Sequence, residues 1–178
     1  MGETTELRMT YIGNELLRRK AGPVTEFGPT LEALLPEMTE IMRVEGGVGL
    51  AAPQAGLSRH FFIYVANADD DEREADEIRL MANVEILGAS RREVVIEEGC
   101  LSVPGLRADV SRPESVRIAY DDIHGERHEL TATGMLARII QHETDHCEGV
   151  LFVDRLSAAR RALLRREIDR ITAEYADR

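Results

Sequence analysis

Gln141-His142-Glu143-Thr144-Asp145-His146 follows the mostly apolar run Met135–Ile140, and together they predict a helix that carries a metal site. Because an α-helix turns by about 100° per residue, side chains four positions apart lie on one face. His142 and His146 can therefore direct two imidazole nitrogens at one divalent ion. Glu143 lies beside that axis, where it can hold a water molecule and accept its proton. Two histidines alone are equally typical of a solvated helix surface, but the glutamate between them favours a metal-dependent hydrolase.

The composition is that of a globular protein with one core. Hydrophobic residues make up 43% and charged residues 31% of the 178 residues, so we expect a single domain spanning residues 1–178. A net charge of −11 argues against binding DNA or another nucleic acid over the whole surface. Two cysteines, Cys100 and Cys147, are too few for a disulfide scaffold. Because residues 1–6 lack the pattern of a secretory signal and no apolar run could span a membrane, we expect a cytoplasmic protein.

Helical patterns flank a series of short strand patterns. Pro29 opens an apolar stripe that ends at Met42, and Pro36 within it marks either a kink or the true first turn of the helix. Ser157 is a good N-cap for a last helix. The expected strands comprise residues 61–65, 80–87, 92–96, 116–120 and 126–131, with turns at Gly88 and at residues 121–125. We therefore predict an α+β fold in which mixed or antiparallel strands pack around the metal-binding helix, with a further helix at the C-terminus.

Several polar groups are assigned to the surface. Residues 69–77 hold seven acidic residues, which indicates a solvated loop, with a metal-buffering patch as the alternative. One face of the last helix carries five arginines, for which solvation is the simpler interpretation and docking onto an anionic partner such as ribosomal RNA is the alternative. His60, His124 and His128 lie in or beside turns, so we expect them to be solvated. The five arginines are Arg160, Arg161, Arg165, Arg166 and Arg170.

The segment Gly47-Val48-Gly49-Leu50-Ala51-Ala52-Pro53-Gln54 has small residues at six of its eight positions. Small residues let another group approach the backbone closely, although a plain turn between a helix and a strand has the same composition. The segment is not a phosphate loop, because it lacks the Gly-Lys-Ser/Thr sequence. Gln54 is the one polar side chain within it that can point at a ligand.

A catalytic metal site needs a third protein ligand besides the two histidines. A third histidine six residues after the second is excluded, because Phe152 stands at that position. Glu167 lies at a suitable distance along the chain for the glutamate ligand of a zinc endopeptidase, but arginines surround it in the sequence. Cys100 follows a predicted strand and a glycine, and a thiolate is a strong ligand for Zn²⁺ or Fe²⁺. From the residues alone both stay open as ligands, with a buried inert cysteine as the alternative for Cys100.

Three segments together resemble the peptide deformylase family. They are Gly47–Gln54, Glu98-Gly99-Cys100-Leu101-Ser102 and Gln141–His146, in the order of the family, and weaker similarity extends from about Tyr11 to Leu156. The resemblance implies hydrolysis of the formyl group from the N-terminal methionine of nascent peptides, with release of formate. The alternatives are a zinc endopeptidase that uses Glu167 as its third ligand and a non-catalytic metal-binding protein.

The resemblance also implies the catalytic groups. Fe²⁺ would be the working ion, and Zn²⁺, Ni²⁺ and Co²⁺ suit the same ligands. Glu143 would accept and return a proton, while the Gln54 amide and the Leu101 backbone N–H would stabilise the oxyanion. The implied metal ligands are Cys100, His142 and His146.

The same segments suggest how a formylated peptide would bind. A peptide can add to Gly47–Ala52 as an extra strand, paired through main-chain groups, so residues beyond the first would matter little. An apolar pocket would then hold the methionine side chain, and positions one and two turns before His142 lie on the face that points into it. The expected pocket residues are Val48, Gly49, Met135 and Ile139.

Overall fold

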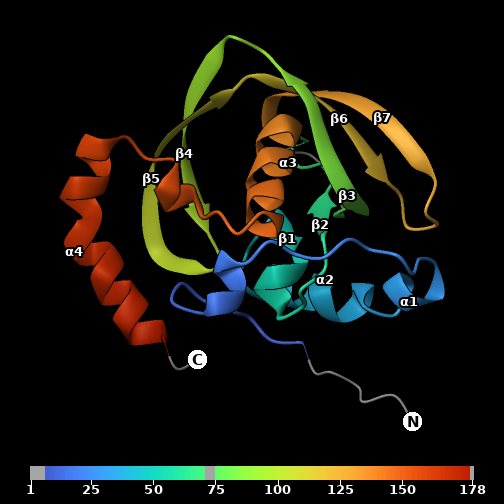
Figure 1. The fold of residues 1–178 in the computed structure, drawn as a ribbon, viewed down its shortest axis with the longest axis horizontal. Helices are drawn as coiled ribbons and strands as arrows, with labels where there is room; N and C mark the ends of the chain where they lie inside the picture. The colour runs from blue at the N-terminus through green and yellow to red at the C-terminus, as the bar shows by residue number, and fades with distance from the viewer. Residues whose placement is uncertain (1–6, 71–74, 177–178) are drawn as a thin grey trace.

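A computed structural model of the chain describes residues 7–70 and 75–176. Helix α3 (Gly134–Cys147) lies at its centre and is enclosed by strands, while α4 (Ala158–Tyr175) packs on the outside (Figure 1). The strands form a five-stranded sheet in the order β1-β2-β3-β6-β7 and a two-stranded sheet of β4 and β5, antiparallel throughout. The strands are β1 Gly49–Ala51, β2 Phe61–Val65, β3 Ile78–Ala89, β4 Glu93–Cys100, β5 Val103–Pro113, β6 Ser115–Asp121 and β7 Arg127–Thr133. The predicted α+β fold around the histidine-bearing helix is confirmed.

Prolines and caps set the helix boundaries. The helical pattern from Pro29 is divided into α1 (Pro29–Glu32) and α2 (Leu35–Val44), and Pro36 occupies the first turn of α2 rather than a kink. Ser157 caps α4, since its side chain accepts a hydrogen bond from the backbone N–H of Arg160. Three 3₁₀ turns complete the fold: η1 Glu15–Arg18, η2 Ala52–Ala55 and η3 Phe152–Asp154. The described helices are all too short or too polar to cross a lipid bilayer.

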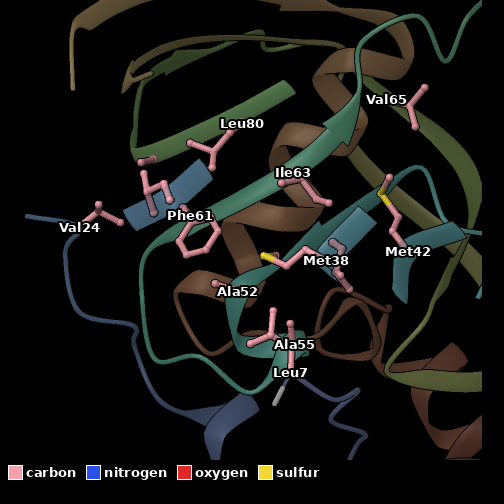
Figure 2. Packing of buried hydrophobic residues seen from close by; sticks show 13 residues of the cluster. Leu7, Val24, Met38, Met42, Ala52, Ala55, Phe61, Ile63, Val65 and Leu80 are labelled. Atoms are coloured by element: carbon pink, nitrogen blue, oxygen red, sulfur yellow. The ribbon is translucent and has the colours of Figure 1, made fainter. Parts of the chain in front are cut away.

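Strand β2 is buried on both faces, which explains its continuous apolar sequence. Phe61, Ile63 and Val65 pack with α2 residues such as Met38 and Met42 in one core cluster (Figure 2). The alternate residues of β2 pack in a second cluster with residues of α3 and of β3 and β6. The histidine-bearing helix is therefore fixed against the larger sheet by apolar contacts along its length.

The structure differs from the sequence expectations in its strands and at one histidine. Gly88 lies inside β3, which continues to Ala89, so the connection to β4 comes later, at residues 90–92. Strands β1 and β5 were not expected; β1 pairs with β2, and β5 supplies the partner that β4 needs. His60 is only 8% exposed, so the expectation of a solvated side chain is wrong, whereas His124 is exposed. Residues 71–74 of the acidic segment lie outside the described residues, so the metal-buffering alternative is not tested there.

Candidate active site

Three metal-ligating side chains from two elements meet at one point. Cys100 is the last residue of β4, and His142 and His146 lie one turn apart on α3. Their ligand atoms all lie within 4.8 Å of one another, and Cys100 Sγ is 3.2 Å from His146 Nε2. Glu167 lies on α4 and belongs to neither of the groups of possible metal ligands found among the described residues. The structure therefore brings Cys100, and not Glu167, to the two histidines.

The donor set fits a divalent transition metal. A thiolate and two imidazole nitrogens are ligands that both Zn²⁺ and Fe²⁺ accept. Burial, and then the neighbouring His142, lower the pKa of His146 well below its usual value, which favours the neutral ring that binds metals. His142 Nδ1 lies 3.0 Å from Glu98 Oε2, so its Nε2 is left for the cluster.

Glu143 lies beside the ligands, against the backbone of β1. It is 4% exposed, and burial raises its pKa to about 7 although the neighbouring His142 acts in the opposite direction. A carboxyl group that titrates near neutral pH suits a general base. Its Oε2 is buried and has no hydrogen-bond partner among the described residues. A Cβ atom added to Gly49 would lie 2.5 Å from Oε1, so this position of β1 has to be glycine for Glu143 to keep its place.

The Gln54 amide lies next to Cys100. Its Oε1 accepts a hydrogen bond from the Ala51 backbone N–H at 2.8 Å, while its Nε2 lies 3.1 Å from Ser102 Oγ and 3.6 Å from Cys100 Sγ. Leu101 follows Cys100 in the tight turn between β4 and β5, and a Cβ on Gly47 would lie 2.7 Å from its Cδ1. The small residues of the glycine-rich segment thus make room for Leu101 and Glu143.

A buried ionic network, which the sequence analysis did not anticipate, supports the site. Glu98 accepts hydrogen bonds from Arg112 (2.7 Å) and Arg138 (2.8 Å), and Arg112 also donates to Asp145 at 2.7 Å. Burial alone would raise the pKa of Glu98, but hydrogen bonds from His142 and Arg112 hold it well below its usual range. The carboxylate that orients His142 therefore stays ionised. Arg138, a charged residue within the apolar run before His142, was the one sequence signal of this network.

A cavity of about 590 Å³ opens beside the ligands. Its wall includes Cys100, His142, Glu143 and Gln54, together with Leu101. All four residues expected to hold the methionine side chain also line it, and Val48 and Met135 lie at its mouth with 39% and 37% exposure. Further apolar wall is provided by residues that the sequence analysis did not select: Ile96, Val103 and Leu106.

A second group of possible ligands lies in the turn between β6 and β7. Asp122, Glu126 and His128 come within ligand distance of one another, but Glu126 is exposed and the other two are half-buried. Asp122 accepts hydrogen bonds from the backbone N–H groups of His124 and Glu126 and lies 2.8 Å from His128 Nε2. Through these contacts the Asp122 side chain stabilises the turn.

Comparison with known proteins identifies the family. The family model for polypeptide deformylase matches residues 7–162. Peptide deformylase of Salinibacter ruber is 43% identical over 162 residues, covering 88% of this chain and 83% of that protein. Peptide deformylase of Thermotoga neapolitana is 40% identical over 162 residues, covering 90% of this chain and 93% of that protein.

Solved structures agree with the sequence comparison. A peptide deformylase from Plasmodium falciparum superposes with a TM-score of 0.86 at 32% identity and covers 94% of this chain and 96% of its own. Arabidopsis thaliana peptide deformylase 1B, solved with an inhibitor, gives a TM-score of 0.86 at 34% identity, covering 94% of this chain and 91% of its own. Because the family model spans most of the chain, and because both the sequence relatives and the solved structures cover most of it, this protein belongs to the polypeptide deformylase family.

Proposed function

We propose that the cavity beside α3 is the place where this peptide deformylase hydrolyses the N-formyl group of nascent polypeptides. The observation that carries the proposal is the meeting of Cys100, His142 and His146 beside a cavity that Cys100, His142 and Glu143 line. A catalytic metal site has three protein ligands and one further position facing the substrate, and this arrangement fits that requirement. Residues 1–178 would then form one catalytic domain.

Cys100, His142 and His146 would hold one divalent ion. A bound ion would polarise the formyl oxygen and make water a stronger nucleophile at neutral pH. Family resemblance favours Fe²⁺ as the working ion, and the same ligands suit Zn²⁺, Ni²⁺ and Co²⁺. Glu98 supports the site because it fixes the ring of His142 through Nδ1.

Glu143 is the proposed general base and acid. Its buried Oε2 takes the proton from water that attacks the formyl carbon, and the carboxyl group then returns this proton to the departing amine. The Gln54 Nε2 and the Leu101 backbone N–H are the proposed donors to the oxyanion that forms. Removal of one such donor typically costs about 10²–10³ in kcat.

The peptide would lie along β1 as an added strand, with its methionine side chain in the apolar part of the cavity. Val48, Gly49, Met135 and Ile139 line that part, which supports their proposed role. Ile139 is 4% exposed, so a larger side chain there would fill the pocket. Ile139→Phe is expected to raise KM for formylmethionyl peptides; unchanged kinetics would remove Ile139 from the pocket.

The decisive experiment joins anaerobic metal analysis to formate release from formyl-Met-Ala-Ser. The proposal expects one metal ion per chain and release of formate. Cys100→Ala should lose the metal and Glu167→Ala should keep it, whereas the endopeptidase alternative requires the reverse. Stoichiometric metal without formate would contradict the proposed activity.

We also propose that the protein acts in the cytoplasm. A second proposal is that the arginine face of α4 contacts ribosomal RNA. The five arginines are exposed, while Leu164, Ile168 and Ile171 of the same helix pack in a further core cluster with apolar residues of β5 and η3. Three of the arginines contact carboxylates, which leaves Arg160 and Arg166 as the better positions to test. Replacement of both with glutamate should reduce cosedimentation with ribosomes, and Arg117→Glu on β6 is the matched control.

A further inference from the structure

The orientation of the Gln54 amide decides whether it can serve the reaction. A primary amide presents an acceptor oxygen on one side and two N–H donors on the other. Only the nitrogen side can stabilise an oxyanion, because the oxygen would repel it. A side chain free to turn over would spend part of its time in the wrong orientation.

Two fixed partners determine this orientation. The Ala51 backbone N–H can only donate, so it selects Oε1 as its acceptor, at 2.8 Å. Ser102 Oγ lies 3.1 Å from Nε2 and accepts one of its two hydrogens. Nε2 also donates to Cys100 Sγ at 3.6 Å, so the nitrogen side of the amide faces the metal ligands.

Ser102 is itself held firmly. It is fully buried, and its carbonyl oxygen accepts a hydrogen bond from the Ile12 backbone N–H at 2.8 Å. It is also the residue after Leu101 in the turn between β4 and β5, so its hydroxyl joins that turn to η2. The two proposed oxyanion donors, on separate segments of the chain, are connected through this one hydroxyl.

We propose that Ser102 is a positioning residue, which holds the Gln54 amide with its nitrogen toward the formyl oxygen. The inference rests on the role of Gln54 in the proposed function. Ser102 is not among the described residues that line the cavity, so its loss lowers kcat and leaves KM and the metal content near their wild-type values. Ser102→Ala leaves the Gln54 amide in the protein but removes the acceptor that orients it. We therefore expect kcat to fall about tenfold, which is less than the fall expected when Gln54 itself is removed.

A double-mutant cycle separates positioning from a general loss of structure. Ser102→Ala should lower kcat about tenfold in the wild type but by less than about twofold in Gln54→Ala, since the residue acts through Gln54. An equal loss in both backgrounds would overturn the inference while leaving the role of Gln54 in place. If Gln54→Ala keeps the wild-type kcat, the proposed role of Gln54 is wrong and the inference falls with it.

Nuclear magnetic resonance supplies a readout that does not depend on activity. The chain has two glutamines, Gln54 and Gln141, so selective ¹⁵N-glutamine labelling gives two side-chain amide groups to follow in the diamagnetic zinc-loaded protein. Gln141 is an internal reference, because its Nε2 donates to Pro113 and Ala137 carbonyl oxygens. In Ser102→Ala the Gln54 proton signals should broaden or move toward those of a free amide, while those of Gln141 stay in place.

Thr10→Val is the matched control for this measurement. It removes another buried hydroxyl, whose Oγ1 donates to the Pro53 carbonyl oxygen of η2 at 2.8 Å, and leaves both partners of the Gln54 amide intact. It should lower the melting temperature without moving the Gln54 signals. Unchanged Gln54 signals in Ser102→Ala would overturn the inference.

Discussion

Glu143 has its carboxylate against the backbone of β1 and beside the metal ligands, so it can be altered without touching a ligand. Glu143→Gln keeps the size of the side chain but cannot accept a proton. We expect kcat to fall by about 10²-fold or more while the metal content is unchanged. Formate release and metal analysis of the same preparation provide the measurement. Glu148→Gln at the end of α3 is the control, and loss of metal from Glu143→Gln would contradict the assignment.

Gly49 tests whether the close approach of β1 to Glu143 matters for catalysis. Alanine at this position places a Cβ 2.5 Å from Glu143 Oε1, so the carboxylate or the strand has to move. Since a displacement of about 1 Å in a catalytic group can cost about 10²-fold, Gly49→Ala should lower kcat/KM by about that factor. Gly88→Ala on β3, where no atom of the described residues lies within 4 Å of the added Cβ, should leave it unchanged. Equal activity of the two variants would show that Glu143 tolerates the shift.

Strands β4 and β5 and helix α3 are tied together by the ion pairs of Arg112. Its guanidinium binds Glu98 on β4 and Asp145 on α3, and its side chain is 4% exposed. Arg112→Leu leaves two buried carboxylates without this partner and is expected to reduce the free energy of unfolding by about 3–5 kcal/mol. Chemical denaturation measures this change.

The matched control is Arg117→Leu on β6. Arg117 pairs with Glu129, and both side chains are more than half exposed (55% and 63%). An exposed pair of this kind is worth about 0–1 kcal/mol. Equal destabilisation by the two variants would mean that the buried network contributes no more than a surface ion pair.

The sequence indicated helices and strands better than the connections between them. The His142–His146 spacing predicted α3 and Ser157 marked a helix start, because each of these signals is local, whereas Pro36 left a kink and a first turn both open. Strand β5 does alternate buried Leu106, Ala108 and Val110 with polar residues, but Arg112 occupies the next buried position and hides the period. The ionic network was missed for a related reason. Glu98 and Asp145 lie 14 and 33 residues from Arg112 in the sequence, and no local pattern relates residues so far apart.

Over the whole molecule, three short segments form one site because the fold stacks them around α3. The sequence could name Cys100 as a candidate ligand, yet only the resemblance, and then the placement of β4 beside α3, removed Glu167 as its rival. Burial of His60 could not be foreseen, since it depends on segments that arrive from elsewhere in the chain. Its backbone N–H donates to the Gly22 carbonyl oxygen at 2.7 Å, and Lys20 and Glu148 lie nearby.

His60 makes the stability of the whole protein dependent on pH. Its Nε2 is buried and has no hydrogen-bond partner among the described residues, and burial lowers its pKa below the ordinary value of 6.5. In the folded state the ring stays neutral, whereas in the unfolded chain it gains a proton below about pH 6.5. The unfolded state then binds more protons, so the free energy of unfolding falls with decreasing pH, by at most about 1.4 kcal/mol per unit, until the folded pKa is reached.

The melting temperature of the wild type should therefore decrease from pH 7.5 to pH 5 more steeply than that of His60→Gln. The other titrating groups are present in both proteins, so the difference between the two curves isolates His60. His124→Gln, at an exposed position, should follow the wild type over the whole range. Parallel curves for wild type and His60→Gln would mean that the buried ring is protonated without penalty. That outcome would place a partner, such as water bridging to Glu148, beside Nε2.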